Sequence, residues 1–547
     1  MSASSASVEK PTEEHVEKGY LDNMNADERL LHELGYRQDL SRSISAFSNF
    51  AIAYSCCSVL AALPPMWGDA MIDAGSSSVI WGWVITSIFT MLVAMSLAEI
   101  CSAYPTTGGL YFWVSRLATA EWVPLACWLT GWCNWIGLAF AITSIDLGLA
   151  QFIAGIIQIW DPEANTSVYM QYGIFIGIII IHGILNSVAV KWNGVMNQGA
   201  FFANMVGIII IVIAGLAITR PLNTGAFVFG QFFNGSGFAN DPFAFLLVIL
   251  QSQYTLSGYD SAAHMSEETQ NSQRGSANGI LLAVAANAVS GFVFLIGIAF
   301  MVKDYDRQIL GESAIQPQMV QVFLDGVGPA WTVVFLVFVM VSIFFCGSSL
   351  TLGSSRMIYA FARDGAMPFS KHLHSLNKQT NNPVIAVWFN IIVAGVIGIL
   401  YMINSTAYEA IVSVNTIGAQ LSYLIPIVLR ITISRKSFVP GPWHLGKFST
   451  PVGIISSCWL VFTCVLFVLP VEAPVTADNM NYAIVPFAAI MLVSSGYFYF
   501  WGRKWFTGPV RIVDGQKVIL EDDEDAQTQP YALKQEVAPE VQNNENK

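Results

Sequence analysis

Long apolar segments recur along the whole chain and constrain its fold more than any other feature. Each is about as long as, or longer than, the ~20 residues that an α-helix needs to cross the ~30 Å hydrocarbon core of a bilayer. The segments are rich in Ile, Leu, Val and Phe and lack the ~10-residue alternation of a membrane β-barrel. They therefore predict an all-α polytopic membrane protein. We place twelve spans at 45–68, 77–103, 124–157, 172–190, 197–219, 241–263, 278–302, 329–360, 384–403, 406–430, 450–470 and 481–502.

The composition supports this class and argues against others. Of the 547 residues, 54% are apolar and only 11% are charged, whereas soluble proteins carry about 25% charged residues. The net charge of −12 comes largely from acidic residues in the two ends, 1–44 and 503–547. We predict that these ends are disordered cytoplasmic tails. Their acidity argues against nucleic acid as a partner, and the lipid bilayer is the expected surroundings of the rest.

Basic residues are distributed unevenly between the loops. With the N-terminus inside, eleven Lys and Arg residues lie in or beside inner loops and three lie in outer loops. Cytoplasmic loops are those that carry an excess of Lys and Arg, so both tails are predicted to be cytoplasmic. The three N-glycosylation sequons begin at Asn165, Asn234 and Asn404. All three fall in predicted outer loops, where this modification takes place.

The sixth span contains a polar interruption that is unusual for a helix in lipid. The stretch Leu250–Glu268, LQSQYTLSGYDSAAHMSEE, follows an apolar run and places Gly258 and Asp260 at about mid-membrane depth. Polar backbone and ionisable groups at that depth are tolerated where they face protein or line a cavity. The interruption therefore marks a candidate functional site.

The first span is interrupted in a similar way. Four small side chains, Ser55, Cys56, Cys57 and Ser58, stand at its middle. They would suit a helix-packing face. The first and sixth spans lie five apart, however, and corresponding breaks in two halves indicate an inverted repeat with the substrate site between the broken helices. We therefore predict a transporter domain, 45–502, with a first repeat 45–219, a second repeat 241–430 and two added spans in 450–502.

The ends of broken helices have a binding chemistry of their own. The N-terminus of a half-helix exposes N–H groups that favour a carboxylate, and the freed carbonyls suit an ammonium group. A zwitterionic amino acid satisfies both. We find no nucleophile–base pair, phosphate loop or dinucleotide fingerprint, so neither an enzyme nor a cofactor is expected.

Several motifs carry a resemblance to a known group of permeases. They include the AE, YP and GG pattern of Ala98–Tyr111, SGYDSAAHMSEET (Ser257–Thr269) and FARDGAMP (Phe361–Pro368). Through them the chain resembles the amino acid–polyamine–organocation (APC) permease superfamily and its amino acid/choline branch. GWCNWIG (Gly131–Gly137) and FVPGP (Phe438–Pro442) extend the resemblance to plant bidirectional amino acid transporters, also described as GABA permeases, and to fungal GABA- and choline-type permeases.

The resemblance implies a twelve-helix permease of the 5+5 inverted-repeat fold that moves small amino acids or related amines such as GABA by alternating access. It implies that Tyr254 is an aromatic gate, that Ser257 and Gly258 contact the substrate through their backbone, and that Asp260 lies just past the break. A choline- or thiamine-like cation permease of the same fold, or a nutrient sensor that does not transport, is the alternative. The plasma membrane is favoured over internal membranes, and a monomer or weak oligomer is expected.

More than one role is possible for each of two acidic and two hydroxyl side chains within the spans. Asp260 could carry a coupling proton, or it could cap the helix that follows it. Asp146 in the third span could bind a substrate ammonium, relay a proton or bond to neighbouring Ser and Thr side chains. Ser348 and Ser349 match the place where sodium-coupled relatives of this architecture hold a cation, or they serve helix packing. The coupling ion, proton or sodium, is thus left open.

The remaining candidates lie at the predicted cytoplasmic end. Four residues could form a gate there, and they are Glu99, His264, Glu267 and Glu268. The two glutamates following the sixth span could pair with Arg116 or Arg363, or they could simply be a solvated helix end. The histidine and the two glutamates lack an evident fourth ligand, so no metal site is expected.

Overall fold

The computed structural model describes residues 24–36, 38–161, 163–188, 192–311, 315–377, 379–380, 382–403, 406–477, 479–509, 511–513 and 516–518. The chain divides into two units, one comprising Arg42–Pro509 and the other comprising Met1–Ser41 together with Val510–Lys547. The tails that were predicted to be disordered lie mostly outside the described residues.

The smaller unit contains one helix and one hairpin in its described part. The helix α2 (Ala26–Glu33) begins at a capping box, in which the Glu28 amide donates to Asn25 Oδ1 at 2.9 Å and the Asn25 amide donates to Glu28 Oε2 at 3.1 Å. The strands β1 (Arg511–Val513) and β2 (Gln516–Val518) pair in antiparallel fashion.

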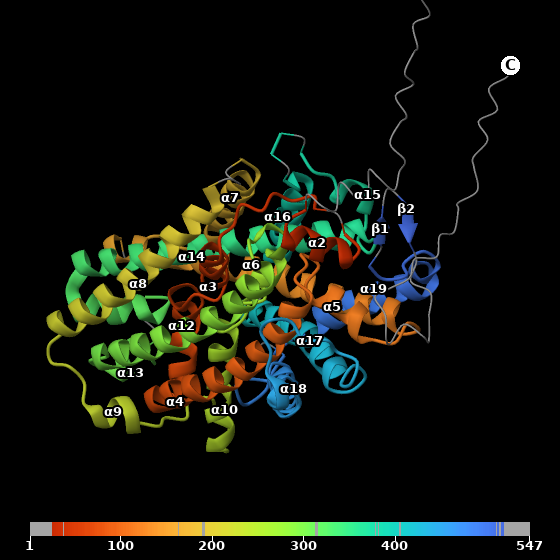
Figure 1. Ribbon diagram of the computed structural model, residues 1–547. Coiled ribbons are helices and arrows are strands. Elements are labelled where there is room, and N and C mark those ends of the chain that lie inside the picture. The colour runs from red at the N-terminus through yellow and green to blue at the C-terminus, as the bar shows by residue number, and fades with distance from the viewer. Residues whose placement is uncertain are drawn as a thin grey trace, which may run out of the picture. The chain divides into compact units, whose positions relative to one another are not determined.

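The larger unit is built of helices (Figure 1). Short helices in its loops are α5 (Leu110–Leu117), α9 (Gly225–Gly230), α13 (Tyr305–Gln308) and α15 (Ser370–Leu373). The helices of the spans are α3 (Ala46–Cys56), α4 (Val59–Ala103), α6 (Val123–Trp160), α7 (Val168–Val188), α8 (Asn193–Ile218), α10 (Asp241–Thr255), α11 (Ser261–His264), α12 (Ser272–Met301), α14 (Gln318–Arg363), α16 (Val384–Gly398), α17 (Ala407–Ile431), α18 (Ser449–Leu466) and α19 (Ile484–Phe500).

The helices account for the predicted spans. Among the described residues, 10 helical stretches are long and apolar enough to cross a membrane. The first of these, Ala46–Ala103, contains two predicted spans, because Gly75 at φ 76° turns the chain between them. A further span is divided between α10 and α11, neither of which is long enough alone. The all-α polytopic fold is therefore confirmed.

Contacts between the helices follow the predicted inverted repeat. The first span (α3) packs on the seventh (α12), and its counterpart, the sixth (α10), packs on the second, which is the latter part of α4. The fifth span (α8) packs on the eighth (α14), and the tenth (α17) packs on the third (α6). Each contact thus recurs between the counterpart spans, five places further along the chain for one partner and five places back for the other, as an inverted repeat requires.

Two groups of helices frame the centre of the larger unit. We call α3, α4, α10, α11 and α12 the core helices, and α6, α7, α14 and α16 the scaffold helices. The α6 helix and its neighbour α17 are the most enclosed, with 78% of their apolar windows buried, against 17% in α19. Their backbones approach closely at two glycines, since a Cβ on Gly418 would lie 2.8 Å from the Gly137 nitrogen.

Candidate functional site

The first span breaks where the sequence predicted it. The α3 helix ends at Cys56. Cys57 and Ser58 leave helical geometry, and α4 begins at Val59. Side chains from other spans bond to this segment. Ser58 Oγ donates to Asn204 Oδ1 at 2.6 Å, and Asn287 Oδ1 accepts from the Val59 amide at 3.1 Å.

The break in the sixth span begins slightly later than Tyr254, its predicted start. The α10 helix ends at Thr255 and α11 begins at Ser261, so that Leu256–Asp260 forms the interruption. Gly258 has φ +88°, a conformation that side chains other than glycine rarely adopt. A Cβ on Gly258 would lie 3.4 Å from the Cys56 carbonyl oxygen. The two breaks therefore face each other directly.

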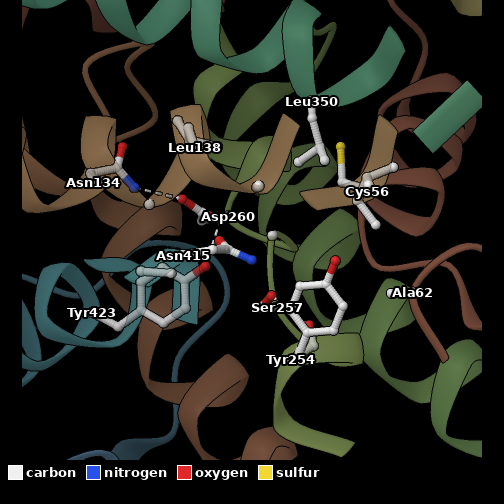
Figure 2. A pocket seen from close by; sticks show the side chains of 15 residues that line it. Cys56, Ala62, Asn134, Leu138, Tyr254, Ser257, Asp260, Leu350, Asn415 and Tyr423 are labelled. Carbon is white, nitrogen blue, oxygen red and sulfur yellow. Dashed lines mark hydrogen bonds between the residues drawn. The ribbon is translucent and has the colours of Figure 1, made fainter. Parts of the chain in front are cut away.

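A cavity lies beside this contact (Figure 2). It offers about 20 Å³ to the centre of a water-sized sphere, which is about the space that one water molecule needs. Among the described residues, its lining combines both breaks with α6, α14 and α17. The lining residues are Cys56, Ala62, Asn134, Gly137, Leu138, Ala141, Ile145, Tyr254, Ser257, Gly258, Asp260, Leu350, Asn415, Ala419 and Tyr423.

Of the nine predicted substrate-binding residues, five line the cavity and four do not. Cys56, Tyr254, Ser257, Gly258 and Asp260 line it. The other four lie outside the lining, and they are Ser55, Cys57, Ser58 and Asp146.

Two polar residues of the lining, Asn415 and Tyr423, were missed by the sequence reasoning. Both belong to α17, whose middle is unusually rich in polar side chains for a membrane span. This polar content was the available signal.

Asp260 is held from three sides and does not cap α11. Tyr423 Oη donates to its Oδ1 at 2.6 Å, and Asn134 Nδ2 donates to its Oδ2 at 3.0 Å. His264 Nε2 lies 3.4 Å from the same Oδ2. Asp260 precedes α11 but makes no side-chain capping bond, which contradicts the helix-cap alternative. The carboxylate instead joins the sixth span to α6 and α17.

Tyr254 closes one side of the cavity. Its ring points into the space shown in Figure 2, and its hydroxyl donates to Ser144 Oγ of α6 at 3.0 Å. Ser257 Oγ donates back to the Tyr254 carbonyl at 2.6 Å. The bond between Tyr254 and Ser144 thus links a core helix to a scaffold helix across the cavity.

Buried ion pairs join the segment after α11 to α14. Glu267 Oε1 accepts from the Thr107 amide at 3.0 Å and lies 3.4 Å from Arg363 Nη2. Arg356 Nε donates to Glu268 Oε1 at 2.9 Å, with the arginine side chain 1% exposed. The predicted partner Arg363 is thus found for Glu267, whereas Glu268 pairs with Arg356, which the sequence did not indicate.

His264 and Glu99 make further links at this end of the bundle. His264 Nδ1 lies 3.1 Å from the Thr107 carbonyl oxygen, so that one imidazole connects Asp260 with the loop before α5. Glu99 Oε1 accepts from the Leu445 amide at 3.2 Å, and its Oε2 lies 3.7 Å from Arg430 Nε. These contacts tie α4 and α11 to their surroundings through buried polar groups.

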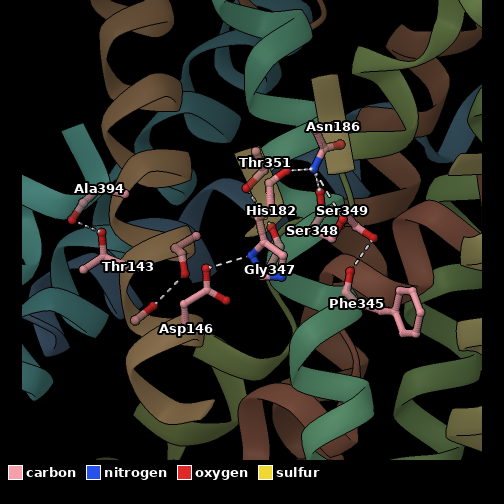
Figure 3. A network of polar contacts seen from close by, with 12 residues as sticks. Thr143, Asp146, His182, Asn186, Phe345, Gly347, Ser348, Ser349, Thr351 and Ala394 are labelled. Atoms are coloured by element: carbon pink, nitrogen blue, oxygen red, sulfur yellow. Dashed lines mark hydrogen bonds and ion pairs between the residues drawn. The ribbon is translucent and has the colours of Figure 1, made fainter. Parts of the chain in front are cut away.

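Asp146 lies deep among the scaffold helices (Figure 3). Its Oδ2 is 3.1 Å from Nδ1 of His182 on α7, and both side chains are 0% exposed. The sequence reasoning missed His182, although a histidine in the middle of the apolar span 172–190 was a visible signal.

The two hydroxyls proposed for a coupling ion are engaged by asparagines. Asn186 Nδ2 donates to the Ser348 carbonyl at 3.1 Å and to its Oγ at 3.3 Å. Ser349 Oγ donates to Asn197 Oδ1 at 2.5 Å. These bonds join α14 to α7 and α8, as the packing interpretation of the two serines expects.

The predicted glycosylation sites differ in their surroundings. Asn165 is exposed, and its Oδ1 accepts from the Ser167 amide at 3.2 Å. Asn234 uses its amide nitrogen to donate to the Phe238 carbonyl at 2.8 Å and to Asp241 Oδ1 at 2.9 Å. Asn404 lies outside the described residues.

Comparison with known proteins adds independent information. The sequence model of a family described as "Amino acid permease" matches residues 44–492. The "Amino-acid permease BAT1" of Arabidopsis thaliana is 37% identical over 507 residues, which are 90% of this chain and 98% of the relative. An uncharacterized amino-acid permease of Schizosaccharomyces pombe is 34% identical over 91% of this chain and 92% of its own. The "GABA-specific permease" of Saccharomyces cerevisiae is 29% identical over 90% and 88%.

Fold, site and relatives agree. The chain is an integral multi-pass membrane protein that transports a small molecule and is not an enzyme. It belongs to the amino acid permease family of the APC superfamily and is a transporter of amino acids or related amines.

Proposed function

We propose that this permease carries a small amino acid such as GABA by alternating access, and that the cavity between the two helix breaks is its substrate site. The observation that carries the proposal is the direct approach of the breaks at Gly258 and Cys56, with the cavity beside them. Helix ends that meet at mid-membrane depth are where inverted-repeat transporters bind their substrates.

The chemistry of the cavity suits a small molecule with two charged ends. The Asp260 carboxylate supplies negative charge on one wall, which favours a substrate ammonium group. The backbone at Ser257 and Gly258, outside both helices, suits the carboxylate end. Leu138, Ala141, Ile145 and Leu350 provide an apolar wall for a short methylene chain. GABA and alanine combine these features, whereas choline lacks the carboxylate.

Two sets of bonds, one on each side of the break in the sixth span, would act as closures that alternate. On one side the bond between Tyr254 and Ser144 holds a core helix against a scaffold helix. On the other side the buried pairs of Glu267 with Arg363 and Glu268 with Arg356 hold the segment after α11 against α14. Breaking one closure while keeping the other would open the site to one face at a time, which is the rocking motion of this architecture. Each permease chain contains both closures, so a monomer suffices.

The orientation of the chain follows from its charges. We propose that both tails are cytoplasmic and that the gate of Glu99, His264, Glu267 and Glu268 faces the cytoplasm of a cell whose plasma membrane holds the protein. Asn165 would then be extracellular. Expression in a glycosylating cell should give a mass shift that Asn165→Gln removes and Asn234→Gln leaves unchanged. Absence of glycan in the wild type would count against this orientation.

Uptake into proteoliposomes tests the proposed function. Purified protein should take up radiolabelled GABA with saturation, and unlabelled small amino acids should compete. A panel of alanine, glutamate, arginine, choline and thiamine separates the alternatives. Saturable uptake of choline or thiamine with no uptake of amino acids would favour the organic-cation permease. Binding of an amino acid without flux, in vesicles where a known carrier works, would favour the sensor.

A further inference from the structure

A buried acid–base pair lies between two scaffold helices, outside the lining of the cavity. Asp146 Oδ2 and His182 Nδ1 are 3.1 Å apart, and neither side chain reaches the surface. Asp146 is the one charged residue in the 38 residues of α6. An ionisable group at such depth in a membrane protein is costly, and it marks ion pathways and proton relays.

One polar atom of each side chain lacks a hydrogen-bond partner among the described residues. Asp146 Oδ1 and His182 Nε2 are buried and have no hydrogen-bond partner within the described part of the chain. Buried polar atoms of a purely structural pair are normally satisfied. Asp260, by contrast, accepts from Tyr423 and Asn134 and contacts His264, so its negative charge is supported on both oxygens. Among the described side chains, His182 alone is bonded to Asp146.

The pair occupies space that a glycine provides. A Cβ on Gly347 of α14 would lie 2.1 Å from Asp146 Oδ1 and 2.8 Å from His182 Cε1. The next residue towards the N-terminus, Cys346, donates its thiol to the Cys56 carbonyl at 3.5 Å. The pair therefore sits against the segment of α14 that touches the break of the first span.

Among the described residues, the other side chains that interact electrostatically with the pair carry no charge of their own. Titratable side chains on neighbouring helices that interact electrostatically with Asp146 are the Cys346 thiol of α14 and the Tyr254 phenol of α10. Both are neutral in their ordinary form at neutral pH. The α16 and α8 helices contribute no charged side chain.

We propose that Asp146 and His182 bind the coupling proton, which extends the transport function proposed above. With His182 neutral and Asp146 ionised, the sealed pair carries one net negative charge. Uptake of one proton from water gives either imidazolium with carboxylate or imidazole with carboxylic acid, and both are neutral overall. Because a buried net charge is unfavourable, the closed protein favours the protonated pair. Release of the proton on the other side of the membrane restores the starting charge.

This proposal selects a proton over sodium. The hydroxyls of Ser348 and Ser349, which a sodium ion would need beside the break of the first span, are bonded to Asn186 and Asn197. The Asp146–His182 pair lies on the same stretch of α14, next to Gly347. It can therefore sense the position of the broken helix without contacting the substrate.

Proton-driven accumulation distinguishes coupling from transport itself. Proteoliposomes at internal pH 7.5 and external pH 6.5 would be loaded with wild type, Asp146→Asn, His182→Gln or the control Thr143→Val, which alters a buried hydroxyl on the same helix. A tenfold proton gradient supports at most about tenfold accumulation of GABA at one proton per substrate. The wild type and Thr143→Val should approach this ratio. The two variants should reach a ratio near one, yet still exchange labelled for unlabelled GABA at equal pH.

A second pair of variants keeps both titratable groups. Gly347→Ala forces Asp146 and His182 to move and should also lose accumulation. Gly353→Ala, on the same helix, should not, because its Cβ would meet Ser261 Oγ at an ordinary 3.4 Å. In the wild type, a pH dye trapped in the vesicles should report acidification when GABA is added outside.

The outcomes separate the two proposals. A wild type that neither exchanges nor takes up any amino acid of the panel overturns the proposed function. A wild type that exchanges GABA but acidifies no lumen and accumulates none overturns the proton proposal alone. Accumulation that persists in Asp146→Asn, His182→Gln and Gly347→Ala also overturns it.

Discussion

Gly258 of the sixth span lies against Cys56 of the first, since a Cβ on the glycine would be in van der Waals contact with the cysteine carbonyl oxygen, at 3.4 Å. These two residues stand at the breaks of helices that are five spans apart. Their approach brings the free ends of both helices to one side of the cavity. The predictions below depend on this contact or on the groups that surround it.

Replacement of Gly258 by leucine should abolish uptake while the protein still reaches the membrane. The side chain would be forced between the two breaks, and the positive φ adds strain of about 1–3 kcal/mol. Gly328→Leu is the matched control, since Gly328 has a similar φ of +77° but nothing within 4 Å of its Cβ position. Uptake by Gly258→Leu at the level of Gly328→Leu would exclude the site.

The hydroxyl bond between Tyr254 and Ser144 should hold the cavity closed. Tyr254→Phe and Ser144→Ala each remove that bond, whose net value is about 0.5–1.5 kcal/mol. Each should raise the KM for GABA about 2- to 10-fold, and the double variant should be no worse than either single one. The KM values of all three variants provide a double-mutant cycle. Additive losses would show that the two hydroxyls act separately.

The buried pair of Arg356 and Glu268 should matter far more for stability than an exposed pair. Removal of one partner of a buried pair costs about 3–5 kcal/mol because the other charge is left unpaired. Arg356→Gln should therefore lower the unfolding temperature in detergent markedly. Arg307→Gln, whose arginine is 68% exposed beside Asp325, should change stability by less than about 1 kcal/mol. Equal shifts for the two variants would contradict the role of burial.

Asp260→Asn should lose most uptake but keep the pH profile of the wild type. The new amide would present a donor towards Asn134 or Tyr423, and an unsatisfied buried donor costs about 1–3 kcal/mol. The residual uptake of GABA, measured from pH 5 to 8, should have its wild-type midpoint because the coupling proton binds elsewhere. A shifted or flattened pH profile would indicate that Asp260 binds the coupling proton.

The sequence was sufficient for the helical fold and for the pairing of the two breaks, because polar groups within apolar spans are rare and their spacing of five spans is itself informative. It placed Tyr254, Ser257, Gly258 and Asp260 in one site. It could not find Tyr423, which meets Asp260 although it lies 163 positions further along the chain.

The sequence also could not show in which direction each side chain on a span faces. Spans that are apolar all round do not reveal by their periodicity which side chain meets which, so Asp146 was placed with the substrate although it meets His182. The helix cap expected for Asp260 failed for a related reason. Local sequence favoured a cap, but Tyr423 and Asn134 from distant helices bind the carboxylate.

Protection of Cys56 by substrate tests the central claim most directly, because this native thiol lines the cavity. Protein in proteoliposomes would be treated with a small thiol reagent, with and without saturating GABA, in a Cys57→Ser background that removes the neighbouring thiol. Mass spectrometry would then follow Cys56 and the exposed Cys458. A substrate that occupies the cavity should slow modification of Cys56 and leave Cys458 unchanged. Equal modification of Cys56 with and without a transported substrate would show that the substrate binds elsewhere.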